Sequence, residues 1–329
     1  MSSDYFTSII QIIDHGSKTN SYKFALLRAL AEHGSLRLTS DRITFEWLAD
    51  RFLAYYWPLT VTFRVRQATD PTRDPVIMRF IREEVSTLGL GSSCRFHDFL
   101  MKHAACYKKL LEKCCANGGC FDEVIPRFHN LRGRAPIERV YEQSGDGVML
   151  NHGAGQFLTS HHRVLNLLAV GGWVKFTEQY SFAPRLYEKI AGIPPERKQE
   201  RYRGFLVALQ GTRCFYCDAE STQLHIDHVV PWSFVLEDRI WNLILACRDC
   251  NCTKSDRTPD NDMLQKLTSR NSKLIRCLQS GELPFESASV RRDLQGFSHE
   301  TLAAHIAAMV ENCRIDGFGV WSAKSSTQH

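Results

Sequence analysis

Two Cys-x-x-Cys motifs, separated by a short segment, constrain the fold of this chain more than any other feature. The first motif is Cys214 and Cys217, and the second is Cys247 and Cys250. Tetrahedral Zn²⁺ takes four thiolate ligands, and each motif supplies two of them from one tight turn. The sequence therefore predicts a closed structural zinc site that joins the two ends of the segment.

The enclosed segment also carries polar residues that a simple zinc ribbon does not need. Asp227 and His228 precede Val-Val-Pro, Asn242 lies near the centre, and Asn251 directly follows the last cysteine. This order resembles the HNH nucleases, also called ββα-metal or His-Me finger nucleases. That family cuts nucleic-acid phosphodiesters with one divalent metal, so the resemblance implies a metal-dependent endonuclease.

The resemblance covers about 45 of the 329 residues. Its closing run, Asn251-x-x-Lys254-x-Asp256, resembles the helix of the HNH domain in RNA-guided CRISPR nucleases. The N-terminal half, from Ser21 to Trp57, is loosely similar to stand-alone bacterial HNH proteins, some of them encoded in anti-phage defence clusters. A role in bacterial defence is an expectation from this looser similarity alone.

The resemblance assigns a role to each polar residue of the segment. His228 is expected to be the general base, and an imidazole with an ordinary pKa of about 6.5 suits that task near neutral pH. Asp227 and Asn251 are expected to bind the catalytic metal. A carboxylate and an amide oxygen are hard ligands, which favour Mg²⁺ or Mn²⁺. Asn242 is expected to brace the hairpin and help to orient His228.

Three neighbouring residues have alternative interpretations. His225 is a competing base, although the family pattern favours a supporting or phosphate-facing role for it. Lys254 is expected either to contact phosphate or to be an ordinary solvated lysine. Cys252 is an alternative zinc ligand. Because both Cys-x-x-Cys motifs are complete, we expect that it does not bind the zinc. For the whole segment, the alternative is a zinc ribbon used only for binding, on which the acid and the amides are incidental.

Composition favours a cytoplasmic protein. The chain has no run of about 18 apolar residues that would span a membrane, and its start does not have the pattern of a secretion signal. Eight of the twelve cysteines lie outside the two motifs without a disulfide framework, which is typical of a reducing compartment.

The net charge of +5 is unevenly distributed along the chain. Residues 1–200 contain 26 Lys and Arg against 21 Asp and Glu, a difference of +5, whereas residues 201–257 and 258–329 are each balanced. Cationic side chains supply most of the attraction between proteins and nucleic acids. The N-terminal region is thus a candidate for holding DNA, and the alternative is an ordinary solvated surface.

Apolar periodicity and breaker residues predict a mainly helical α+β fold. We expect an α-rich N-terminal domain over 1–195, a nuclease domain over 196–262 and C-terminal helices with a polar tail over 263–329. The expected elements are helices at 21–33, 44–56, 98–115, 161–190 with breaks at glycine and proline, 263–278 and 298–313, and strands at 60–67 and within 148–158.

Two further functional patterns have a simpler explanation. The helices at 21–33 and 44–56 have the order of a helix-turn-helix DNA reader, but core helices produce the same pattern. Cys106, Cys114, Cys115 and Cys120, with His103 or His129 nearby, suggest a second metal site. Their spacing matches no known metal-binding motif, and buried cysteines are common, so core packing is favoured.

These expectations combine into a DNA-nicking HNH endonuclease whose N-terminal domain positions or restrains it. Its expected partners are DNA and a regulatory protein or a defence-system component. The rival from another class is a non-catalytic module that binds DNA or a partner on a degenerate HNH scaffold. The presence of all three signature residues favours the enzyme.

Overall fold

The computed structural model describes residues 2–36, 40–131, 138–281 and 288–323, and it divides into two compact units. The first comprises Met1–Phe182 and Leu186–Ile193, and the second comprises Ala183–Arg185 and Pro194–His329. Helices predominate and the sheets are small, which confirms the expected mainly helical α+β class. Within the described parts of the chain, no helix is both long and apolar enough to cross a membrane.

The first unit is a set of helices with one small sheet, whose strands are ordered β1-β3-β2 and pair antiparallel. Its elements are α1 (Ser2–His15), α2 (Tyr22–Ser35), β1 (Arg42–Thr44), α3 (Phe45–Trp57), the π-helical turn η1 (Pro58–Thr62), α4 (Val76–Thr87), α5 (Phe96–Lys102), α6 (Ala104–Cys115), α7 (Phe121–Arg127), β2 (Tyr141–Ser144), β3 (Gly147–Leu150), α8 (Ala154–Thr177) and α9 (Leu186–Ala191).

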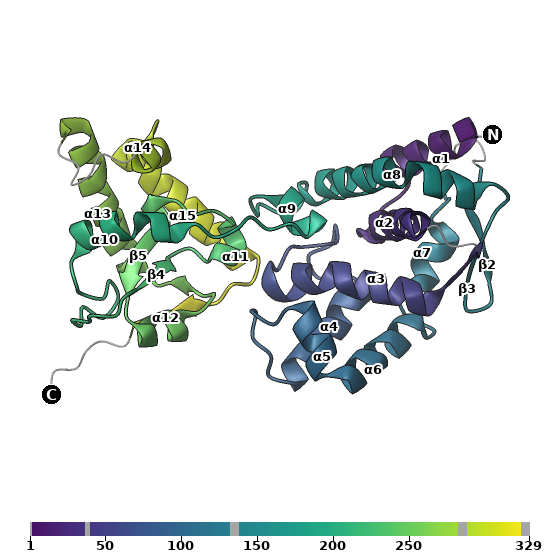
Figure 1. Cartoon of the computed structure of the whole chain (residues 1–329), viewed down its shortest axis with the longest axis horizontal. Helices are drawn as coiled ribbons and strands as arrows, with labels where there is room; N and C mark the ends of the chain where they lie inside the picture. Colours follow the sequence, from purple (N-terminus) through teal and green to yellow (C-terminus); the bar gives the residue numbers. More distant parts are fainter. Residues whose placement is uncertain (1, 37–39, 132–137, 282–287, 324–329) are drawn as a thin grey trace. The chain divides into compact units, whose positions relative to one another are not determined.

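The core of this unit forms where α2 packs along α8 (Figure 1). Glycine permits the close approach at two points. A Cβ on Gly34 would lie 2.5 Å from the backbone of Leu158, and a Cβ on Gly172 would lie 2.7 Å from the Phe24 ring. Side chains all around α2 are buried. It is therefore a core helix, as the favoured interpretation expects.

The strand expected over 60–67 is not formed. Instead, η1 continues directly from α3, and the amide of Phe63 donates to the carbonyl of Pro58 across 2.8 Å. Arg64 then takes a positive φ of 53°, which is not a strand conformation. The alternating apolar residues are still buried, but by an irregular turn and not by a sheet: Leu59, Val61, Phe63 and Val65.

Three other helix or strand boundaries differ from those expected from the sequence. The helix expected over 98–115 is two helices, α5 and α6, separated at His103. Gly153 adopts a left-handed conformation and starts α8, so the expected strands within 148–158 reduce to β3. The Gly171-Gly172 pair does not interrupt α8, because Gly172 faces the α2 contact. Arg132 and Arg134, which contribute to the positive charge of residues 1–200, lie outside the described residues, as do residues 324–329 of the polar tail.

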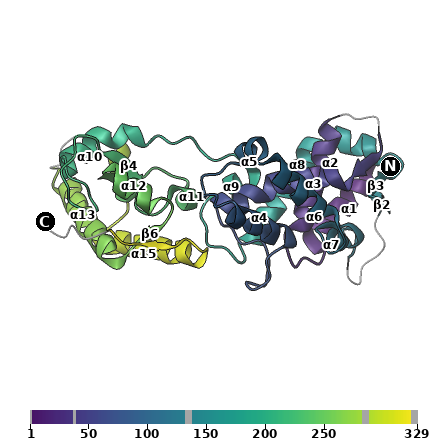
Figure 2. The same ribbon diagram turned by 90° about the horizontal axis from the view of Figure 1, so that it is seen from below.

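The second unit surrounds the β4–β5 hairpin with helices (Figure 2). The C-terminal helices belong to this unit. Its elements are the 3₁₀ turn η2 (Gln199–Tyr202), α10 (Arg203–Gln210), β4 (His225–His228), α11 (Trp232–Val235), the 3₁₀ turn η3 (Ile240–Asn242), β5 (Leu243–Ala246), α12 (Arg248–Lys254), β6 (Thr258–Pro259), α13 (Asn261–Ser280), α14 (Ala288–Leu294), α15 (His299–Ile315) and β7 (Val320–Trp321).

Polar side chains of α13 attach this helix to the hairpin. Arg270 donates to the carbonyls of Leu243, Ile240 and Trp241, at 2.8, 3.2 and 3.0 Å. Burial lowers the pKa of Arg270 to about 9. Asn271 also donates to the carbonyl of Trp241 at 2.9 Å. These bonds satisfy buried backbone groups of the turn that leads into β5, and so they fix the position of Asn242.

Candidate active site

The four motif cysteines lie together. The Sγ atoms of Cys214, Cys217, Cys247 and Cys250 are all within 4.8 Å of one another. Zn–S bonds of about 2.3 Å in a tetrahedron place the sulfurs about 3.8 Å apart, and Cys217 and Cys247 are separated by 3.8 Å. The geometry therefore fits the zinc ion that the spacing predicts. Cys252 is exposed and is not part of this group.

The other cysteines do not form a second site. Cys114 and Cys120 are fully buried, and Cys106 and Cys115 are half-buried. In the described part of the chain, neither these four nor the nearby histidines form a metal-binding group. Core packing, the favoured explanation, accounts for them.

Asn242 holds the end of β4 immediately after His228. Its carboxamide accepts from the amide of Val230 at 2.7 Å and donates to the carbonyl of the same residue at 2.9 Å. Its own carbonyl accepts from the amide of Val229 at 2.9 Å. The side chain is 1% exposed, so it cannot contact a substrate. Its contacts are those of a brace for the hairpin.

Asp227 is buried beneath a tyrosine and a lysine. Its Oδ2 accepts from the hydroxyl of Tyr216 at 2.7 Å and pairs with Nζ of Lys254 at 3.2 Å. Nζ also donates to the carbonyl of His228 at 2.7 Å. Lys254 is 0% exposed, so the expectation of a solvated or phosphate-contacting lysine is wrong. The lysine instead joins α12 to β4, the strand that carries Asp227 and His228.

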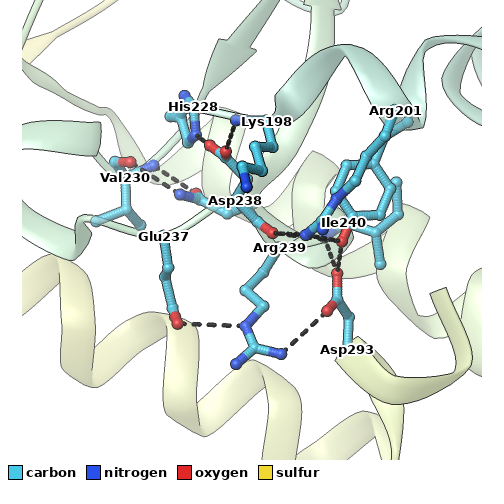
Figure 3. Close-up of polar contacts among 11 residues, drawn as sticks. Lys198, Arg201, His228, Val230, Glu237, Asp238, Arg239, Ile240 and Asp293 are labelled. Atoms are coloured by element: carbon cyan, nitrogen blue, oxygen red, sulfur yellow. Dashed lines mark hydrogen bonds and ion pairs between the residues drawn. The ribbon is translucent and has the colours of Figure 1, made fainter. Parts of the chain in front are cut away.

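The His228 ring contacts an acid that the sequence reasoning missed (Figure 3). Nε2 of His228 and Oδ1 of Asp238 are 2.8 Å apart, and both side chains are buried. Burial lowers the pKa of His228, although Asp238 acts in the opposite direction. Burial raises the pKa of Asp238, but its bonds to His228 and to the amide of Lys198 outweigh this and lower it. An acidic residue in a polar turn gave no distinct signal in the sequence.

Asn251 and His225 lie on the elements around His228. Asn251 is half-buried on α12, which packs against β4 (Figure 2). His225 begins β4, opposite Ala246, and its side chain is exposed. The positively charged Arg197 acts on His228, because its charge contributes to the lowered pKa of that histidine. The Arg197 guanidinium stacks on the ring of Trp232 at 4.2 Å.

Comparison with known proteins agrees with this geometry. The family described as HNH endonuclease matches residues 214–260, and a domain of unknown function (DUF8808) matches residues 2–113. The chain is similar to the CRISPR-associated endonuclease Cas9 of Streptococcus mutans, with 35% identity over 88 residues. That match covers 25% of this chain and only 6% of the relative. No solved structure matches the chain.

The family match covers the same segment that holds the four cysteines and the polar residues of the hairpin. The similarity to Cas9 supports the same assignment. Residues 214–260 therefore form an HNH endonuclease domain with a four-cysteine cluster.

Proposed function

We propose that this protein hydrolyses phosphodiester bonds of DNA, with His228 as the general base and one Mg²⁺ or Mn²⁺ bound by Asp227 and Asn251. The observation that carries the proposal is the contact of Nε2 of His228 with a carboxylate, which leaves Nδ1 as the nitrogen that can take a proton. A single site of this kind cuts one strand in each turnover, so nicking is the expected product.

The chemistry assigned to His228 is a single proton transfer. Nδ1 accepts a proton from a water molecule, whose oxygen forms a new bond to phosphorus while the bond from phosphorus to the leaving oxygen breaks. The leaving oxygen takes a proton from solvent. General-base catalysis of this kind contributes about 10²- to 10⁴-fold in rate. The lowered pKa of His228 keeps the ring neutral, and thus able to act, at neutral pH.

The donor set fits a hard divalent ion. Tyr216 and Lys254 both contact Oδ2 of Asp227, so we assign Oδ1 to the metal, together with the carboxamide oxygen of Asn251. These two oxygen donors would suit Mg²⁺, which in proteins usually keeps several water or phosphate ligands. When bound, such an ion neutralises charge on the phosphate and on the leaving oxygen.

The direct test is incubation of the purified full-length protein with supercoiled plasmid and either Mg²⁺, Mn²⁺ or EDTA. We expect relaxed, nicked plasmid with either metal and intact plasmid with EDTA. Zinc content is measured before and after EDTA, because loss of the structural ion would also stop cleavage. Intact plasmid under every metal condition, in folded protein that retains zinc, would favour the rival non-catalytic binding module.

Single-stranded RNA and DNA of the same sequence, tested under the same conditions, separate the two nucleic-acid substrates. We expect DNA to be cut and RNA to remain intact. Cytoplasmic location, a regulatory protein partner and a role in anti-phage defence remain predictions from the sequence, and the plasmid assay does not depend on them.

A further inference from the structure

The contact between His228 and Asp238 determines which nitrogen of the ring carries the proton. An ionised carboxylate only accepts hydrogen bonds, and the two atoms in contact are Nε2 and Oδ1, 2.8 Å apart. The hydrogen between them must therefore belong to Nε2. A neutral imidazole carries one ring proton, so Nδ1 holds the lone pair. Asp238 thus selects the tautomer that a general base on the Nδ1 side requires.

Asp238 is itself held from a different part of the chain. Its Oδ2 accepts from the backbone amide of Lys198, a residue just before η2. Its carbonyl accepts from Arg201 at 3.3 Å. These two donors lie in the turn Lys198–Tyr202, close to the start of the second unit. Both oxygens of the carboxylate are thus engaged, and the side chain has a defined direction (Figure 3).

A second acid anchors the residues that follow Asp238. Asp293, 5% exposed on α14, accepts from the amide of Ile240 at 2.9 Å and from Arg239 at 3.0 Å. The Tyr202 hydroxyl also donates to Asp293. The loop is therefore fixed on both sides of Asp238: by the turn Lys198–Tyr202 on one side and by α14 on the other.

We propose that Asp238 is a positioning residue that holds the His228 ring in the catalytic tautomer and orientation, and that the turn Lys198–Tyr202 holds Asp238 in place. The proposal rests on the role of His228 as the general base. It divides two tasks that the sequence pattern assigned to one residue: Asn242 braces the backbone of the hairpin, and Asp238 orients the ring.

The kinetic test compares two substitutions of Asp238 in the full-length protein. In Asp238→Asn, the oxygen can still accept from the Lys198 amide, and the NH₂ group then donates to Nε2. This stabilises the wrong tautomer, with the proton on Nδ1. In Asp238→Ala, the ring is free to adopt either tautomer. We therefore expect Asn to lower kcat by about 100-fold or more with little change in KM, and Ala to lower it less.

A merely structural role predicts the opposite order, because Ala removes the bond to Lys198 whereas Asn retains it. An Ala variant that is slower than the Asn variant at matched thermal stability would overturn the proposal. Glu237→Gln is the matched control. It makes the same change in the adjacent residue, whose carboxylate pairs with Arg239 and Arg185, and nicking should be unchanged.

A spectroscopic test does not depend on activity. The protein is labelled with ¹⁵N-histidine and studied without Mg²⁺, at a pH above the ordinary imidazole pKa of about 6.5. The His228 signals are identified by their loss in His228→Gln. We expect a protonated Nε2 in the parent and a protonated Nδ1 in Asp238→Asn. The Nδ1 tautomer in the parent would overturn the proposal, whether or not the protein cuts DNA.

A parent with the expected tautomer but no nicking would refute only the proposed function. The supporting turn is tested with Arg201→Met, which removes the side-chain donor to the carbonyl of Asp238. We expect a smaller loss of kcat than in Asp238→Asn, and a mixture of the two tautomers in the ¹⁵N spectrum. A spectrum identical to the parent's would refute the role of Arg201 in holding Asp238.

Discussion

Lys254 places a buried positive charge beside β4, the strand that carries Asp227 and His228. Its ammonium group contacts Oδ2 of Asp227 at 3.2 Å and the carbonyl of His228 at 2.7 Å. Removal of one partner from a buried ion pair leaves the other charge without compensation, which costs about 3–5 kcal/mol. We therefore expect Lys254→Met to lower the free energy of unfolding by about that amount and to impair nicking. Urea unfolding of the parent and the variant measures this.

The double variant Lys254→Met/Asp227→Asn isolates the ion pair. If the loss arises from the uncompensated carboxylate, the double variant should be more stable than Lys254→Met alone, although it should not cut DNA. Equal or lower stability of the double variant would show that packing, and not charge, explains the effect. Lys266→Met changes a lysine that is not paired with Asp227, and it serves as the control for loss of a lysine near the zinc site.

At the scale of single residues, the sequence predicted those contacts that follow from the spacing of residues along the chain. The two cysteine pairs come together because each pair is local and the hairpin joins them. The bracing contacts of Asn242 could be predicted because the resemblance to the HNH pattern assigns it that place. The burial of Lys254 and the contact between Asp238 and His228 could not be predicted. The burial of Lys254 depends on how α12 packs on β4, and Asp238 depends on donors from Lys198–Tyr202, a distant part of the sequence.

At the scale of elements, adjacent glycines of α8 provide a matched pair of substitutions. A Cβ on Gly172 would lie 2.7 Å from the Phe24 ring and 3.0 Å from Ile13, whereas a Cβ on Gly171 would have open space. We expect Gly172→Ala to lower the free energy of unfolding by about 1–3 kcal/mol through overpacking. Gly171→Ala should raise it by up to about 1 kcal/mol, because alanine favours the helix. Thermal melts of both variants measure this difference.

Equal melting temperatures for the two variants would contradict the packing of α2 against α8. These glycines also show why the sequence pattern was wrong about this helix. Glycine is a helix breaker by propensity, but a close helix contact selects it for its small size. The strand expected over 60–67 is a similar case, because the alternation correctly predicted which residues are buried. The positive φ of Arg64, which is incompatible with a strand, could not be recognised from the neighbouring residues in the sequence.

A buried histidine makes the first unit sensitive to acid. Nε2 of His129 accepts from the amide of Val140 at 3.0 Å, which requires a neutral ring nitrogen. Burial, with Arg139 and Lys23 nearby, lowers the pKa of His129 to about 4. The unfolded chain, with an ordinary pKa of about 6.5, binds a proton first as the pH falls. Stability due to this group is therefore complete above about pH 6.5 and is lost as the pH falls toward 4.

From pH 7 to pH 5 this linkage amounts to about 2 kcal/mol. The measurement is urea unfolding at the two pH values for the parent and for His129→Gln, whose amide oxygen can still accept a hydrogen bond but does not titrate. We expect the parent to lose about 2 kcal/mol more than the variant over this interval. Parallel losses in the two proteins would contradict the buried neutral state of His129.

At the scale of the whole molecule, the charge distribution predicts where DNA is held. All of the net positive charge lies in residues 1–200, and the nuclease segment 201–257 is balanced. We therefore predict that full-length protein binds DNA more tightly than a fragment starting at Pro194, the first residue of the second unit after the boundary. The affinity of the full-length protein should also fall more steeply with salt, because more counterions are released on binding.

Fluorescence anisotropy of a labelled duplex at two salt concentrations measures both quantities. The opposite arrangement, in which the N-terminal unit restrains the nuclease, predicts a fragment that nicks faster than the full-length protein at both salt concentrations. That result would refute the holding role. The matched domain of unknown function lies in this N-terminal unit, so the comparison would also be a first test of its role.

The central claim is that the HNH domain cuts DNA through His228, and plasmid nicking by His228→Ala tests it most directly. Parent, His228→Ala and the remote control His299→Ala are compared at equal concentration in Mg²⁺, after melting curves and zinc content have been matched. We predict nicking by the parent and by His299→Ala, and a loss of about 100-fold or more in His228→Ala. Near-parental nicking by stable, zinc-loaded His228→Ala would contradict the assignment of the base.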